Sequence, residues 1–267
     1  MTAIDNPRSG VAEAAPASKN RHLPLSAAFG WLKAGWRDLW RRPGPSLAYG
    51  AGVFVASLIV ITAILRAGWG HVLFPALAGF MIVGPLVAIG LYEKSRLLET
   101  GREASFNDMV FARAQAGGQV LFIGAILSLL MVFWMRAAVL VYALFFGLRP
   151  SPGLEDIVPM LFTTPVGWAM LFVGSIVGAL FAAFSFAISV LAIPMLLDRP
   201  VDAFTAMGTS MAHVWANLPV MLAWGAIVLA LFLLSLLTGL LGLVVIFPLL
   251  GHATWHAYRA MKIGDGK

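Results

Sequence analysis

One arginine lies inside an apolar segment, and a charged residue in such a segment often has a function. Arg136 falls in a stretch that begins near residue 119 and fades near residue 146. A charged side chain at the centre of a bilayer costs about 3 kcal/mol or more and usually marks a ligand or ion pathway. Near the end of a span, however, an arginine can extend to the headgroups, and the adjacent Trp134 suits an interface. Both interpretations of Arg136 stay open.

Two histidines near the C-terminus form the second candidate. His252 and His256 are four residues apart in GHATWHAYR, so they share a helix face. Paired imidazoles can bind zinc, copper or haem iron, but a complete site needs further ligands, and no HExxH pattern occurs. The alternative is a polar, aromatic interface that includes Trp255 and Tyr258. The chain has no cysteine, which excludes thiolate sites, and we expect no cofactor.

Two acidic residues complete the candidates. Glu93 and Asp202 lie at the ends of apolar segments, where they can pair with nearby arginines, and Asp202 can also cap the next helix. The sequence contains no GxSxG elbow, phosphate-binding glycine loop or triad spacing. We therefore expect no enzyme and no catalytic residue.

The candidate residues lie in a chain that consists mostly of apolar segments. It is 60% hydrophobic and 11% charged, whereas soluble domains have about 25% charged residues. A membrane-crossing helix needs about 20 apolar residues. Six such segments are predicted: 46–65, 72–92, 119–146, 166–197, 219–237 and 240–258. The fourth is long enough to require a break, for which Pro194 is the expected place.

The distribution of basic residues predicts the orientation. Fifteen of the 18 Lys and Arg fall in the termini and in the loops on the same side, which favours both termini in the cytoplasm. Residues 1–24 are polar and rich in Pro and Ala, without the apolar core of a signal peptide, so a disordered tail is expected. Residues 261–267 form a short C-terminal tail.

The segment before the first span is predicted to be an amphipathic helix. One face carries large apolar residues at helical spacing, namely Phe29, Leu32, Trp36, Leu39 and Trp40. Beside them, Lys33, Arg37 and Arg41 recur every four residues. This pattern is typical of a helix in the headgroup layer, where the cations would contact anionic inner-leaflet lipids. The alternative is a soluble helix packed on the inner loops.

The same pattern recurs 175 residues later. Phe29, Trp36 and Trp40 correspond to Phe204, Met211 and Trp215, and the register continues without a gap from Phe29 to Ala51. A weaker copy of the pattern lies 74 residues after the first. The second halves of the first and third copies also align, at an offset of 163 residues, where Pro85 matches Pro248. Chance similarity between apolar helices is the alternative. The repeats predict a membrane domain over 25–260 with three units, 25–99, 105–198 and 201–260.

These observations define the expected fold. It is an all-α polytopic membrane protein with six transmembrane helices arranged as three helical hairpins, each preceded by an inner-face amphipathic helix. The net charge of +6 is explained by topology, so no nucleic-acid partner is expected.

Four motifs, AGWRDLWRRPGPSLAYG, VGPLVAIGLYEKSR, LDRPVDAFTAM and FPLLGHATWHAYR, give the chain a family resemblance. It resembles a bacterial family of integral membrane proteins that is known only as a domain of unknown function, sometimes labelled cytochrome c oxidase subunit I-like. The resemblance covers roughly residues 25 to 260. It implies a bacterial inner-membrane location, but no agreed activity and no binding residue. The oxidase label would require haem-ligating histidines in several spans, and the few histidines here lie mostly at span ends.

Three functions follow as hypotheses. The first is a non-enzymatic scaffold, assembly factor or accessory subunit, with another membrane protein as partner. The second is a small-solute channel or transporter that uses Arg136. The third is a haem- or metal-binding membrane protein that uses His252 and His256.

Overall fold

The structure is a computed structural model that describes residues 23–147 and 154–261, and all regular elements in these ranges are helical. The two predicted tails, 1–24 and 261–267, lie almost wholly outside the described residues. The elements are α1 (Ala27–Trp40), α2 (Pro43–Arg66), η1 (Gly70–Val72), α3 (Leu73–Val87), α4 (Ile89–Glu99), α5 (Phe106–Val110), α6 (Gly117–Phe146), α7 (Leu154–Thr163), α8 (Pro165–Ser189), α9 (Ala192–Asp198), α10 (Ala203–Ala216), α11 (Leu218–Leu237) and α12 (Leu243–Met261). The predicted all-α class is confirmed.

Five helical segments among the described residues are long and apolar enough to cross a membrane. They are Pro43–Arg66, Leu73–Glu99, Gly117–Phe146, Pro165–Asp198 and Leu218–Leu237, with mean hydropathies between 2.1 and 2.6. They coincide with the first five predicted spans, so the chain is a multi-pass membrane protein. The sixth predicted span corresponds to α12, which is not in this set. Its C-terminal half carries the polar HATWHAYR sequence and is buried except at His256, Arg259 and Ala260. The count of six spans stays a prediction.

The break expected near Pro194 is confirmed. Helix α8 ends at Ser189 and α9 begins at Ala192, because a proline removes one backbone donor and clashes with the carbonyl four residues earlier. Ser210 of α10 satisfies the backbone there. Its hydroxyl accepts from the Leu191 N–H at 3.3 Å and donates to the Ala187 carbonyl at 2.7 Å.

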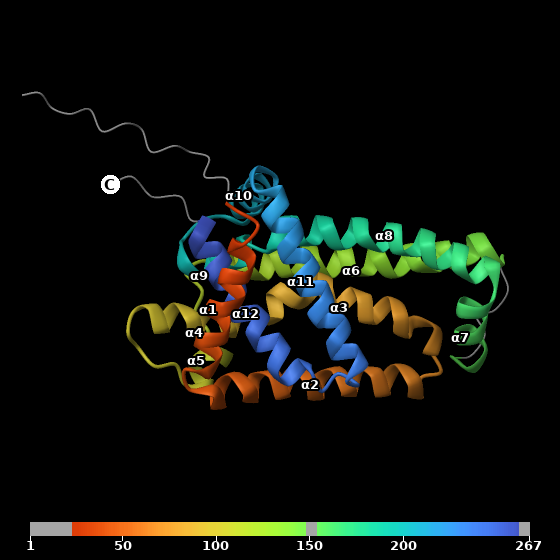
Figure 1. Cartoon of the computed structure of the whole chain (residues 1–267), viewed down its shortest axis with the longest axis horizontal. Helices are drawn as coiled ribbons and strands as arrows, with labels where there is room; N and C mark the ends of the chain where they lie inside the picture. The colour runs from red at the N-terminus through yellow and green to blue at the C-terminus, as the bar shows by residue number, and fades with distance from the viewer. Residues whose placement is uncertain (1–22, 148–153, 262–267) are drawn as a thin grey trace, which may run out of the picture.

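Helices α2, α3, α6 and α8 run in one direction, whereas α11 and α12 cross it obliquely (Figure 1). Figure 1 shows α2, α3, α6 and α8 along the long axis of the molecule, with α7 at one end and α1, α5, α9 and α10 near the other. Both ends of the described chain lie at this second end, where the Leu23 N–H donates to the Asn217 side chain at 3.1 Å. Helix α1 runs across the long axis, as a helix in the plane of a membrane surface would.

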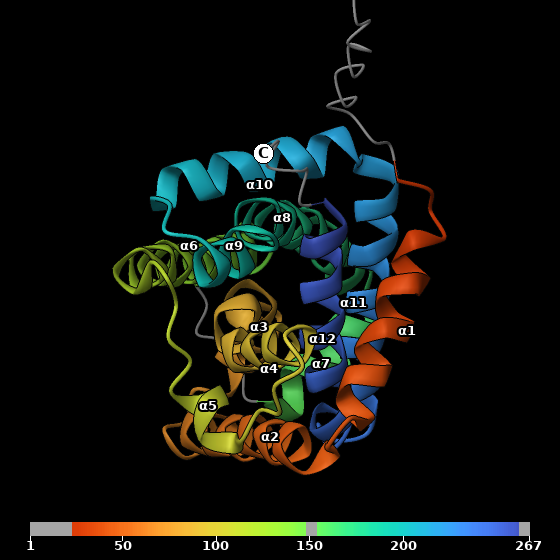
Figure 2. The same cartoon turned by 90° about the vertical axis from the view of Figure 1, so that its left-hand side faces the viewer.

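The three short helices that precede the first span of each predicted repeat, α1, α5 and α10, pack in a cyclic order. We call them the surface helices. Helix α1 packs on α12, α5 packs on α4, and α10 packs on α8 and α9. Figure 2, which views this end, shows α1, α5 and α10 around a centre that contains α4, α9 and α12. In each predicted repeat, the short helix before the first span therefore contacts the second span of the preceding repeat. For α1, in the first repeat, the contacted helix is α12 of the third repeat, which closes the cycle. The repeat boundaries themselves stay predictions.

Candidate functional site

The structure separates Arg136 from the other candidate residues. It lies on α6 with its side chain exposed, and it has no hydrogen bond or ion pair with the side chains that the structure describes. Arg136 lines neither the apolar cavity beside α2 nor the small cavity beside Tyr258. This location corresponds to a lipid-facing or interfacial position more closely than to a central pathway.

The two acidic candidates have structural contacts. Glu93 is buried and accepts two hydrogen bonds of 2.8 Å from the guanidinium of Arg96. Asp202 begins α10, where its carboxylate accepts the Thr205 N–H at 2.9 Å, and the hydrogen bonds from Thr205 lower the pKa of Asp202. The helix cap predicted for Asp202 is thus confirmed.

His252 lies at the centre of a buried polar cluster. Its side chain is fully buried on α12, and each ring nitrogen has a serine partner. The Oγ of Ser46 on α2 lies 2.9 Å from Nε2, and the Oγ of Ser95 on α4 lies 2.9 Å from Nδ1. One imidazole therefore joins three helices that are distant in the sequence.

Lys94 is equally buried, next to Ser46. Its Nζ donates to the Ser46 Oγ at 2.7 Å and to the Arg42 carbonyl at 2.9 Å. No carboxylate among the described residues lies within ion-pair distance of this ammonium. Arg42 separates α1 from α2 with a positive φ of 62°, which is uncommon for a residue other than glycine. Lys94 thus holds the carbonyl of a strained connection in place.

His256 reaches the other end of the cluster, one helical turn later on α12. Its Nε2 lies 2.8 Å from the Asp38 Oδ2, and the same oxygen accepts the Ser95 hydroxyl at 2.7 Å. Burial acts to raise the pKa of Asp38, but the hydrogen bonds from His256 and Ser95 outweigh it, so the pKa is lowered.

These contacts assign the proton positions. A carboxylate only accepts, so Ser95 donates to Asp38 and must accept from the Nδ1–H of His252. The Nε2 of His252 then accepts from Ser46, which accepts from Lys94. All donors in this series of hydrogen bonds point from the buried ammonium of Lys94 toward the partly buried carboxylate of Asp38.

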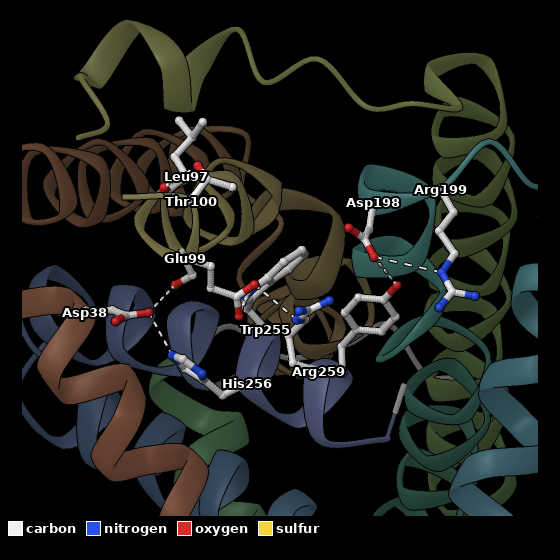
Figure 3. Close-up of polar contacts among 11 residues, drawn as sticks. Asp38, Leu97, Glu99, Thr100, Asp198, Arg199, Trp255, His256 and Arg259 are labelled. Atoms are coloured by element: carbon white, nitrogen blue, oxygen red, sulfur yellow. Dashed lines mark hydrogen bonds and ion pairs between the residues drawn. The ribbon is translucent and has the colours of Figure 1, made fainter. Parts of the chain in front are cut away.

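The remaining polar residues of the C-terminal motif also dock on neighbouring helices. The Trp255 indole donates to Glu99 at 3.0 Å, and Arg259 forms an ion pair with the same carboxylate at 3.1 Å. The Tyr258 hydroxyl donates to Asp198 at 2.7 Å. Figure 3 shows these contacts beside the Asp38–His256 pair. We call the five motif residues His252, Trp255, His256, Tyr258 and Arg259 the α12 clamp.

The clamp corresponds to the polar, aromatic interface that was the alternative to metal binding. Both nitrogens of His252 and the Nε2 of His256 are directed at protein partners. Within 23–147 and 154–261, no group of three or more His, Cys, Asp or Glu is placed to hold a metal ion. Ser46 lies between an ammonium and an imidazole, an arrangement that can activate a nucleophile. However, it is fully buried and lines neither cavity, so a structural role fits it better.

Sequence reasoning did not identify four members of this cluster: Asp38, Ser46, Lys94 and Ser95. Lys94 contributed only to the charge count on one side of the membrane. Serines are common in apolar helices, and nothing in the local sequence separates these two from the others. Their role depends on contacts between residues up to 218 positions apart.

Comparison with known proteins agrees with this description. No curated protein and no solved structure gives a significant match. Residues 73–198 match the model of a family described as "Predicted integral membrane protein (DUF2189)". This match confirms the predicted resemblance to a membrane family of unknown function over the segment from α3 to α9, which is narrower than the predicted range of 25 to 260.

Proposed function

We propose that the protein is a non-enzymatic scaffold, assembly or accessory component of a bacterial inner membrane, crossing it six times with both termini cytoplasmic. The α12 clamp is the observation that carries this proposal. Each of its side chains has a protein partner on α1, α2, α4 or α9. The residues best suited to chemistry are thus engaged in fixing the relative positions of helices.

The cavities also favour this proposal over transport of a polar solute. The larger cavity is lined almost entirely by apolar side chains and lies away from Arg136. A solute pathway would need polar groups along the membrane interior. The second cavity has a volume of only about 70 Å³.

Two surface helices offer different faces to partners. Helices α1 and α10 expose the same register positions, Phe29, Trp36 and Trp40 on α1 and Phe204, Met211 and Trp215 on α10. The cations of α1, Lys33, Arg37 and Arg41, correspond at offset 175 to Gly208, Ala212 and Ala216. Helix α1 therefore suits anionic headgroups, whereas the uncharged face of α10 suits a membrane-protein partner.

Co-purification after gentle extraction tests the proposal. We expect a second membrane protein in a fixed ratio with the full chain, and we expect the double substitution Phe204→Ser/Trp215→Ser to remove it. The matched control is Phe29→Ser/Trp40→Ser on α1, which should retain the partner. A chain that always purifies alone, even after cross-linking in the membrane, would contradict the proposal.

A further inference from the structure

A large apolar cavity lies between α2 and α3. Its volume is about 420 Å³, and it is bounded by α2, α3, α5 and residues at the α11–α12 hairpin. Tyr49 and Ser57 contribute the hydroxyl groups in its wall, and both are engaged. Tyr49 donates to the Val87 carbonyl at 2.7 Å, and Ser57 donates to the Val53 carbonyl at 2.8 Å. The cavity therefore presents hydrocarbon to any occupant.

The cavity exists because the α11–α12 hairpin does not extend along the whole of α2. Leu240, next to the turn, lines the cavity together with Ser57 and Ile61 of α2. Figure 1 shows the hairpin ending beside α2 before the outer end of that helix. Beyond the turn, α2 and α3 face each other across the space.

The cavity opens sideways, toward the surrounding membrane. Gly52, Ala56 and Val60 line it and are exposed. All three lie within Pro43–Arg66, a segment with the length and composition of a membrane span. The medium at the opening is then lipid, and an empty space there would forfeit van der Waals contacts on every side.

Aromatic rings close the inner end, and arginines flank in sequence the elements that line it. Phe106 of α5 packs edge-on against Tyr49, with ring centroids 6.5 Å apart. Exposed arginines lie at the ends of the lining elements, Arg41 before α2 and Arg102 and Arg113 on either side of α5. The acidic groups nearby are already engaged, because Glu103 pairs with Arg42 and Asp108 caps α5. The segments that flank this end therefore carry more arginines than acidic residues.

We propose that this cavity holds one acyl chain of an anionic phospholipid, with the headgroup at the inner end that these arginines flank. Transfer of a lipid tail from bilayer to cavity exchanges one apolar medium for another, so the hydrophobic effect supplies little affinity. Selectivity comes from the shape of the cavity and from the phosphate–arginine contacts. This site is independent of the proposed scaffold role.

Native mass spectrometry of the full chain, released from nanodiscs of phosphatidylglycerol and phosphatidylcholine, tests the site. We expect one retained phospholipid per chain, enriched at least about fivefold for phosphatidylglycerol in a mixed bilayer. Gly52→Trp should reduce retention several-fold, because Gly52 lines the cavity and no atom lies within 4 Å of a Cβ added there. Gly225→Trp is the matched control, since Gly225 has the same open space on a membrane helix but lies outside the cavity.

The outcomes separate the alternatives. Equal retention in the Gly52 and Gly225 variants, or no retained lipid in the wild type, would overturn the site. Equal retention of the two phospholipids would overturn the headgroup assignment. A protein segment cross-linked to position 56 in place of lipid would show that a partner helix fills the cavity, and would also overturn the proposal.

Discussion

The surface helices α1 and α10 share one sequence pattern, but different polar contacts attach them to the rest of the molecule. Helix α1 and the start of α2 meet α12 through the partly buried Asp38, the fully buried Ser46 and their partners. At offset 175 the corresponding residues of α10 and α11 are His213 and Met221. There the buried polar contact is that of Ser210 with the backbone at the α8–α9 break. Similar packing thus serves both regions, while the polar chain occurs only at α12.

The difference suggests what the polar chain contributes. Buried polar groups cost free energy unless they are paired, and a fully paired network favours one arrangement over others more than it adds stability. The α1–α12 contact would therefore be the more specific of the two and the less tolerant of partial deletion. Five predictions can break or sharpen this comparison.

Removing His252 should have the largest effect. His252→Ala leaves Ser46 and Ser95 without their shared partner and opens a cavity, so we expect a loss of about 2–5 kcal/mol in the free energy of unfolding. His213→Ala, in the half-buried α10 position, should cost less than about 1 kcal/mol. Unfolding by SDS titration in mixed micelles measures both. Equal losses would show that the two regions do not differ.

Shortening Lys94 should destabilise more than neutralising it. Lys94→Ala leaves the Arg42 carbonyl and Ser46 without a donor, at a cost of about 2–3 kcal/mol. Lys94→Met leaves the same two acceptors without a donor but keeps most of the volume and removes a buried charge, so its loss should be smaller, about 1–2 kcal/mol. The same SDS titration applies. If the methionine variant were as unstable as the alanine variant, the ammonium would contribute more than packing.

A methyl group added at Gly50 should destabilise the protein more than one added at its repeat counterpart Gly225. A Cβ there would meet the Val244 carbonyl and Pro248 of α12, so Gly50→Ala should cost about 1–3 kcal/mol. Its repeat counterpart Gly225 has open space, and Gly225→Ala should be neutral or stabilising by up to about 1 kcal/mol. Thermal midpoints from fluorescence-detected size exclusion would compare them. Matching shifts would contradict the close α2–α12 contact.

Acid should weaken the α1–α12 contact specifically. The pKa of Asp38 lies below its ordinary value of 3.8, so its contribution to stability is present above that value and is lost as the pH falls through the folded-state pKa. Position 38 faces His252 and His256 in both the wild type and the Asp38→Asn variant, so titration of these histidines is common to the two proteins. Between about pH 6 and about pH 3, the wild type should lose more thermal stability than Asp38→Asn. A larger loss in the variant would reverse the assigned sign.

Replacing Arg136 should have the smallest effect. The side chain is exposed and has no hydrogen bond or ion pair with the described side chains, so Arg136→Leu should change stability by less than about 0.5 kcal/mol. Solute flux in proteoliposomes should equal that of protein-free liposomes, with or without the substitution. Flux that required Arg136 would support the transport hypothesis instead of the scaffold.

Much of the fold could be predicted because each feature is local. Apolar length predicted five spans close to the observed ones, Pro194 the α8–α9 break, and Asp202 the cap of α10. Helix α7 had no corresponding prediction, because its ten residues are too few for a span and lie between two predicted spans. The site was less predictable. His252 and His256 drew attention by type, but their serine, lysine and aspartate partners did not.

The sequence by itself determined that the chain is helical and membrane-embedded, because apolar length and the spacing of charges act within one segment. It also contained the repeated register of Phe29–Ala51 and 204–226. Only the tertiary structure decided what the conspicuous polar residues do. Whether an imidazole binds a ligand or joins helices depends on the groups within 3 Å of its nitrogens. Those groups come from α1, α2 and α4, whose positions relative to α12 are set by packing between segments far apart in the chain.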